Sequence, residues 1–218
     1  MNNPNEANNL LTMYLKDVPN PSQIERQFII LCETLSNYSL YSPEERLTNF
    51  EKAIVLTCPQ YVKCKFPRIL SFEEIIILNN IAVCYTQVGD AEQAILILYH
   101  LKRYYESNVM NFEEILRTQP LILYNLSKYL GCSGRYDECI EIADLGIRIA
   151  RETGRCSFLD GLLYNRAWSL MRRKRDGDKE TALSSAKQAF ELASIMENGA
   201  AVNLYKNFLK TNFPEINY

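Results

Sequence analysis

The stretch LNNIAVCYTQVGDAEQA, residues 78–94, decides the expected fold of this chain. Counting from Leu78, apolar or small residues recur at i, i+3, i+4 and i+7, which is one stripe of a helix. Gly89 ends that helix, and a second apolar stripe begins at Ala94. Because Ala82 and Ala94 are both small, two antiparallel helices can approach closely here. The stretch therefore predicts a helical hairpin of tetratricopeptide type.

The same pattern recurs twice further along the chain. A second stripe starts at Leu123 and turns at Gly134, and a looser third stripe starts at Leu163 and turns around Gly177. The turns at Gly89 and Gly134 lie 45 residues apart, whereas the usual tetratricopeptide period is about 34 residues. We therefore expect longer helices or longer connections than in a standard repeat.

These repeats predict an all-α protein, a tetratricopeptide-like right-handed superhelix of antiparallel helical hairpins with a C-terminal capping or dimerisation helix. We expect an N-terminal helix and linker over residues 1–21 and a repeat domain over residues 22–213. The elements expected in the repeat domain are hairpins at about 22–58, 71–107, 112–153 and 157–196 and an end helix at 198–213.

Three serines mark the expected starts of helices. Ser22, Ser42 and Ser71 are each followed three residues later by glutamate, which is the capping-box pattern. In such a box the hydroxyl accepts a backbone N–H, and the glutamate accepts the N–H of the serine. A further long helix starting near residue 112 contains Pro120, which can kink it.

Composition limits the possible functions. The 218 residues are 47% hydrophobic and 23% charged, as in an ordinary soluble protein, and 24 basic residues against 26 acidic ones give a net charge of -2. This balance favours neither nucleic acid nor acidic membrane as a partner. The longest apolar run, residues 94–99, is too short to cross a bilayer. No secretory signal opens the chain, and its seven cysteines form no C-x-x-C pair, so we expect a cytoplasmic protein with reduced thiols.

Motifs for catalysis, metals and cofactors are missing from the sequence. It has no phosphate loop, nucleophile elbow, dinucleotide fingerprint or zinc-protease motif. The single histidine, His100, lies in an apolar helical stretch, where a structural role is expected. We therefore expect no enzyme activity, no metal site and no cofactor.

The face of the first helices opposite the packing stripe is the candidate binding surface. Asn80, Asn125 and Asn165 occupy the same phase in the three copies, 45 and then 40 residues apart. A carboxamide offers both a donor and an acceptor to the backbone of an extended peptide, and nearby aromatic residues offer apolar area. The alternative is a solvated face whose asparagines tie helices together. The residues expected to bind peptide are Asn79, Asn80, Val83, Gln87, Tyr124, Asn125, Lys128, Tyr164, Asn165, Trp168 and Arg172.

Two further features have alternative interpretations. The basic run at residues 172–175 stands at the end of a helix, where cations are favoured, or else contacts an acidic partner. The last helix is either a solubilising cap or a dimerisation helix, because Tyr205, Phe208 and Leu209 are bulky for a cap.

The segments at residues 70–82, 121–130 and 161–168 resemble the C-terminal repeat region of Rgg/PlcR-like regulators from Gram-positive bacteria. The similarity covers roughly residues 22–213. Those regulators join a Cro/cI-type helix-turn-helix to a tetratricopeptide-like domain that binds short peptide pheromones and dimerises. The resemblance implies that Asn80, Asn125 and Asn165 hold the peptide backbone. About 20 residues before Ser22 are too few for a helix-turn-helix, so the chain is either the sensor part of a longer regulator or a regulator that lost its DNA reader.

The sequence thus predicts a peptide-binding sensor and dimerisation domain of a bacterial transcription regulator. Its expected partners are a short peptide or protein tail and a second copy of the chain, with DNA contacted only through a helix-turn-helix not present in this chain. The main alternative is a protein–protein interaction scaffold without a signalling peptide. An enzyme or phosphatase-type modulator of a response regulator shares the repeat architecture but lacks a catalytic constellation here.

Overall fold

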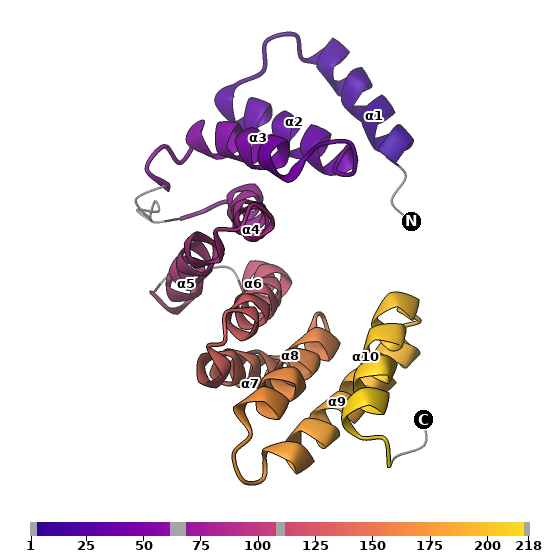
Figure 1. Ribbon diagram of the computed structural model, residues 1–218. Helices are drawn as coiled ribbons and strands as arrows, with labels where there is room; N and C mark the ends of the chain where they lie inside the picture. The colour runs from indigo at the N-terminus through magenta and orange to yellow at the C-terminus, as the bar shows by residue number, and fades with distance from the viewer. Residues whose placement is uncertain (1–3, 62–68, 108–111, 216–218) are drawn as a thin grey trace. The chain divides into compact units, whose positions relative to one another are not determined.

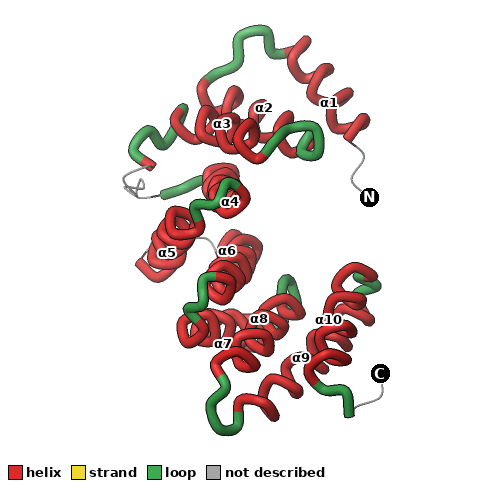
Figure 2. The backbone as a smooth tube through the Cα atoms, in the orientation of Figure 1, coloured by secondary structure: helices red, strands yellow, loops and turns green. Residues whose placement is uncertain are grey.

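The computed structural model describes residues 4–61, 69–107 and 112–215, and within these ranges the chain is helical without a strand (Figures 1 and 2). The predicted all-α fold is confirmed. None of the described helices is long and apolar enough to cross a membrane. The helices are α1 (Pro4–Asp17), α2 (Gln23–Ser36), α3 (Pro43–Val55), α4 (Phe72–Gln87), α5 (Ala91–Ser107), α6 (Phe112–Cys132), α7 (Tyr136–Thr153), α8 (Leu159–Arg173), α9 (Asp178–Ile195) and α10 (Gly199–Asn212).

The helices begin and turn where the sequence indicates. Ser22, Ser42 and Ser71 each accept the backbone N–H three residues on, and each following glutamate completes the capping box. Gly89 and Gly134 have φ values of 93° and 77°, a left-handed conformation that costs glycine little and most residues much. These turns allow α4 and α5, and likewise α6 and α7, to fold back on each other.

The chain divides into two compact units, residues 1–110 and 111–218, and each is described by itself. In the N-terminal unit a buried polar network joins three helices. Gln27 of α2 donates to the Ala53 carbonyl of α3 at 3.1 Å and to Thr57 at 2.6 Å, and Thr57 donates in turn to Glu74 of α4. Because Glu74 also closes the capping box of α4, the network fixes where that helix starts relative to α2 and α3.

In the C-terminal unit, α6 and α8 run side by side in the same direction. The Tyr124 ring of α6 lies against Gly161, and Ser127 hydrogen-bonds Asn165 one turn later. A Cβ on Gly161 would come within 2.4 Å of the Tyr124 ring. The missing side chain at this position is therefore what lets the two helices approach.

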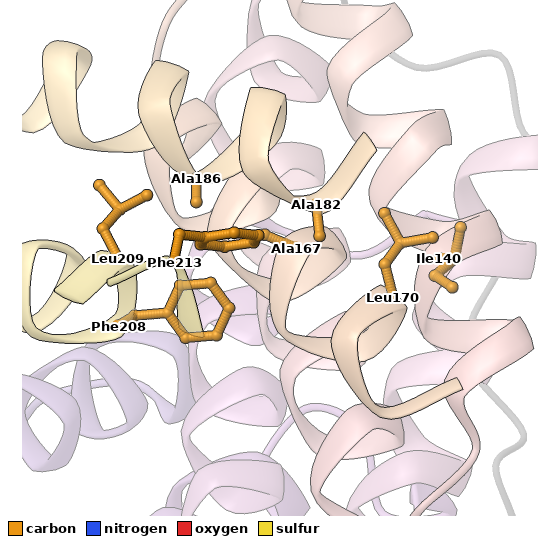
Figure 3. Packing of buried hydrophobic residues seen from close by; sticks show 8 residues of the cluster. All are labelled: Ile140, Ala167, Leu170, Ala182, Ala186, Phe208, Leu209 and Phe213. Atoms are coloured by element: carbon orange, nitrogen blue, oxygen red, sulfur yellow. The ribbon is translucent and has the colours of Figure 1, made fainter. Parts of the chain in front are cut away.

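Helix α10 covers the last hairpin. Phe208, Leu209 and the following Phe213 are buried against Ala182 and Ala186 of α9 (Figure 3). The alanines leave room between the helices, which the two phenylalanine rings fill at 6.4 Å between centroids. This packing is the arrangement expected of a cap on a repeat array.

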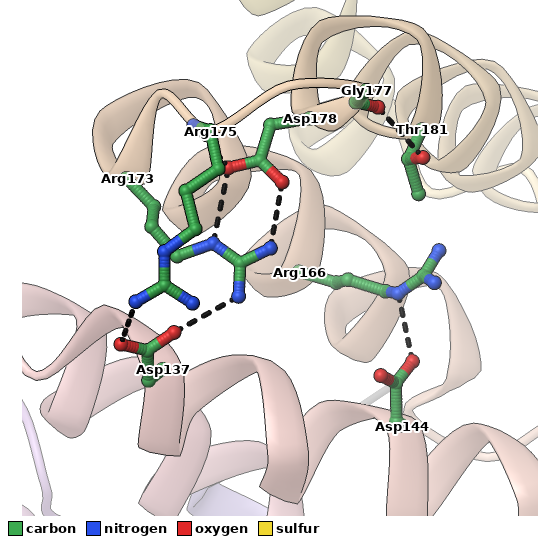
Figure 4. Close-up of polar contacts among 8 residues, drawn as sticks. All are labelled: Asp137, Asp144, Arg166, Arg173, Arg175, Gly177, Asp178 and Thr181. Carbon is green, nitrogen blue, oxygen red and sulfur yellow. Dashed lines mark hydrogen bonds and ion pairs between the residues drawn. The ribbon is translucent and has the colours of Figure 1, made fainter.

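Ion pairs tie the turn between α8 and α9 to the start of α7. Asp178 accepts two hydrogen bonds from Arg173, at 2.6 and 3.0 Å, and one from the backbone N–H of Arg175 (Figure 4). Asp137 of α7 bridges the guanidinium groups of Arg173 and Arg175. The hydrogen bonds from Arg173 lower the pKa of Asp178 to about 2.

We expect Asp178→Asn to lower the free energy of unfolding at pH 7 by about 1.5–3 kcal/mol, the usual loss for hydrogen bonds to a charged group. Because folding lowers this carboxyl's pKa, its stabilisation is present above the unfolded pKa of about 4 and is lost as pH falls through about 2. Urea unfolding across this range should therefore show the two proteins converging in acid. The neighbouring exposed Asp176→Asn is the control, and an equal loss there at pH 7 would contradict the assignment.

Candidate functional site: an aromatic cavity between α6, α8 and α10

A cavity of about 240 Å³ opens in the C-terminal unit. It brings together five of the eleven residues that the sequence predicts for peptide binding, namely Tyr124, Lys128, Tyr164, Asn165 and Trp168. The other lining residues are Ser127, Gly131, Cys132, Cys139, Ser169, Leu204 and Tyr205. Their positions on α6, α7, α8 and α10 make the cavity a product of tertiary packing rather than of one segment.

The first turn of α8 holds the Tyr124 ring in place. Phe158, directly before α8, stacks on Tyr124 with the ring centroids 5.5 Å apart. Phe158 has φ 61°, an unusual conformation for a bulky residue. On the same turn, the Asp160 carboxylate accepts a hydrogen bond of 3.1 Å from the Tyr205 hydroxyl of α10. Two rings of the cavity wall thus depend on residues at the start of α8.

The remaining rings join α8 to its neighbours. Tyr164 stacks on Tyr205 of α10 at 4.8 Å between centroids. Trp168 packs edge to face on Tyr136 of α7, with the ring centroids 6.1 Å apart. The Arg172 guanidinium lies over the Trp168 ring, 3.3 Å from its centroid. The indole is therefore fixed on α8 while it lines the cavity.

Asn165 has its amide orientation settled by its neighbours. Its Nδ2 donates to the Tyr124 carbonyl at 3.2 Å and to the Ser127 hydroxyl at 2.9 Å. A backbone carbonyl can only accept, so the nitrogen must face α6 and Oδ1 must face away. Oδ1 accepts no hydrogen bond from the described residues and remains accessible, although the residue as a whole is only 7% exposed. Asn165 therefore ties two helices together and still offers one acceptor to the cavity.

The other in-phase asparagines have different surroundings. Asn80 of α4 is half-buried and donates to the Ile76 carbonyl one turn earlier in its own helix. Asn125 is buried in α6 outside the cavity lining, and Asn79 of α4 is also buried. Asn80 and Asn165 thus share a helical phase but have different hydrogen-bonding roles.

Three predicted binding residues remain to be placed. Val83 is half-buried on α4, and Gln87 near the end of that helix accepts a hydrogen bond from Arg46 at 3.1 Å. Arg172 is exposed in the last turn of α8, where it lies over Trp168 rather than in the cavity wall. Peptide binding by the residues of α4 stays a prediction.

Sequence reasoning missed the contribution of α10 to the cavity. Leu204 and Tyr205 line it, although the bulk of Tyr205 had indicated only a role in capping or dimerisation. Tyr205, Phe208 and Leu209 are 4%, 8% and 0% exposed, and all three pack inside the chain. This burial supports the capping interpretation, and dimerisation through these side chains stays a prediction.

Three buried ionisable groups in the cavity wall are held in their neutral forms. Burial raises the pKa of Tyr124 and Tyr164, and it raises the pKa of the Cys139 thiol to about 11. Lys128 is the one Lys or Arg lining the cavity, and the lining contains neither Asp nor Glu. No cluster of metal-ligating side chains occurs among the described residues.

The hairpins and the cavity define a helical-repeat protein of tetratricopeptide type. The model of the RNPP family C-terminal domain matches residues 11–212. The chain therefore belongs to the RNPP family, which confirms the resemblance to PlcR-like regulators. Comparison with curated proteins gave no match.

Two solved structures of Bacillus thuringiensis PlcR share the fold. The apo form has a TM-score of 0.72 at 19% sequence identity, over 94% of this chain and 71% of PlcR. PlcR in complex with the peptide PapR7 and DNA has a TM-score of 0.67 at 20% identity, over 91% of this chain and 68% of PlcR. This likeness confirms the tetratricopeptide-like architecture.

We expect Asn165→Ala to lower the free energy of unfolding by about 1–3 kcal/mol. The substitution removes the amide that donates to the Tyr124 carbonyl and the Ser127 hydroxyl of α6. Asn80→Ala is the matched control, since its amide bonds only its own helix and its loss should cost no more than about 0.5 kcal/mol. Chemical denaturation of both variants checks this. Equal losses would show that Asn165 does not tie α6 to α8.

We expect Phe208→Ala to cost about 3–5 kcal/mol of unfolding free energy, as for other buried phenylalanines. Phe208 packs edge to face on Tyr164 and Phe213 within one chain, so the loss should be independent of protein concentration. Urea unfolding at several concentrations measures it. A loss that shrinks as the protein is diluted would instead place Phe208 at a dimer interface, because a wild-type dimer gains stability from protein concentration.

Proposed function

We propose that this chain is the peptide-sensing part of a bacterial transcription regulator and that a short peptide binds at the cavity between α6, α8 and α10. The observation that carries the proposal is the combination of an aromatic wall with the open Oδ1 of Asn165. The rings supply apolar contact area, and the amide oxygen accepts a main-chain N–H. Membership of the RNPP family supports this function, as does the complex of PlcR with the peptide PapR7.

The size of the cavity favours a peptide over a compact small molecule. Pockets for drug-sized ligands measure about 300–1,000 Å³, whereas this one measures about 240 Å³. It therefore holds one side chain of a ligand whose remaining length lies outside. A peptide has this form, and its main chain then passes Asn165.

We further infer that the chain is not an enzyme. Efficient general acids and bases have pKa values near the working pH, whereas burial raises the pKa of Tyr124, Tyr164 and Cys139 away from neutrality. These groups stay protonated at pH 7 and suit contact rather than proton transfer. A cytoplasmic location agrees with the free thiols of the described cysteines.

We also propose that the chain forms a homodimer and that, by itself, it binds duplex DNA only weakly. A net charge of -2 allows little counterion release, so the chain alone should bind DNA weakly. The described residues contain no helix-turn-helix domain. The concentration dependence of unfolding given above for Phe208→Ala tests whether α10 takes part in the dimer.

Filling the cavity should abolish peptide binding without unfolding the chain. Cys132 is exposed at the edge of the cavity, so Cys132→Trp places a bulky ring at its mouth. Peptides that co-purify with the wild-type chain from its native host, identified by mass spectrometry, should be missing from this variant. A synthetic copy of such a peptide should change Trp168 fluorescence in the wild type.

Cys156→Trp is the control, because Cys156 is also exposed but lies outside the cavity lining. It should retain the peptides. If peptides are recovered equally from both variants, they bind elsewhere. If only a larger protein is recovered, the chain acts as a scaffold.

A further inference from the structure

The arginines in the basic run at the end of α8 have two different roles. Arg173 and Arg175 are held by Asp137 and Asp178, so their charges are balanced at the turn. Arg172 instead lies over Trp168, and it forms no ion pair with any described residue. One cation of the run is thus left for contact beside the cavity.

A second unpaired cation lies on the neighbouring helix. Lys128 of α6 lines the cavity and likewise forms no ion pair within the described parts of the chain. It follows Ser127, which bonds Asn165, and it precedes Gly131, which lies against Trp168 and Ser169. Since α6 and α8 run in the same direction, Lys128 and Arg172 both lie toward the C-terminal ends of their helices, Lys128 in the cavity lining and Arg172 beside it.

The charge of this end is positive even after the helix dipoles are included. The C-terminal ends of α6 and α8 each carry about -0.5 charge, whereas Lys128 and Arg172 together carry two positive charges. The sum is about +1, and no Asp or Glu lines the cavity to balance it. The carboxylate of Asp160 lies at the opposite end of α8 and is occupied by the Tyr205 hydroxyl.

We propose, building on the peptide-binding function above, that the cavity takes an apolar side chain of a peptide whose adjacent carboxylate lies against Lys128 and Arg172. The apolar side chain packs among Tyr124, Tyr164 and Trp168. The carboxylate belongs either to an Asp or Glu side chain or to the peptide's own C-terminus. The ligand is therefore an acidic apolar peptide and not a basic one.

Fluorescence anisotropy with four pools of N-terminally labelled hexapeptides tests this on the full chain. All pools contain Leu, Ile, Val and Phe. The first pool adds Asp and Glu and has a free C-terminus, and the second has the same composition with an amidated C-terminus. The third pool adds Lys and Arg and has an amidated C-terminus. The fourth pool contains the apolar residues alone with a free C-terminus.

We expect the first pool to bind about 10- to 100-fold more tightly than the third, the range for a hydrogen bond between charged partners. Added salt should weaken its binding. Retained affinity of the amidated acidic pool assigns the carboxylate to a side chain. If the fourth pool binds tightly and the amidated acidic pool does not bind, the carboxylate is that of the peptide's C-terminus.

Lys128→Glu should lower the affinity for the first pool by the same factor and raise that for the third. Lys128→Met should lower the affinity for the first pool without raising the affinity for the third. Lys210→Glu makes the same charge change at an exposed position of α10 outside the cavity lining, and it should alter neither affinity more than about twofold.

The proposal falls if the basic pool binds the wild type as tightly as the acidic pool, or if Lys128→Glu leaves the preference unchanged. It also falls if no pool binds. In that case the co-purification experiment with Cys132→Trp decides separately whether the peptide-binding function fails as well.

Discussion

The close parallel contact between α6 and α8 is the constraint on which the C-terminal unit depends. Gly161 admits the Tyr124 ring, and the Asn165 amide bonds the carbonyl of that same tyrosine. Sterics and hydrogen bonding therefore act on one residue of α6 from two successive turns of α8. A larger residue at 161 would separate the helices and, with them, the two main walls of the cavity.

This contact also determines what α10 does. Once Tyr164 is fixed on α8, Tyr205 can stack on it and donate its hydroxyl to Asp160. One turn later, Phe208 and Leu209 enter the core below. The helix that caps the array therefore also forms the third wall of the cavity. The proposed ligand site and the last hairpin consequently use the same side chains, so a ligand that binds only the folded cavity would stabilise the packing of α10.

Much of the fold was predictable because its signals are local. Helical periodicity, capping serines such as Ser71 and turn glycines such as Gly89 act within a few residues, and the helices start and turn there. The cavity was predictable only in part. Asn80 and Asn165 share a helical phase, yet one bonds its own helix and the other bonds α6. Phase tells which way a side chain points from its helix axis, but its partner is supplied by a neighbouring helix.

The basic run shows the same limit for charge. Residues 172–175 cross the end of α8, and Lys174 has φ 59°, so helical periodicity no longer relates their directions. Arg173 and Arg175 meet carboxylates of α7 and α9 that are distant in sequence, and Arg172 remains over Trp168. The ion pairs that stabilise the turn therefore engage Arg173 and Arg175 and leave Arg172 available for contact. The sequence contains four basic residues in a row, whereas the fold determines that Arg172 lies beside the cavity.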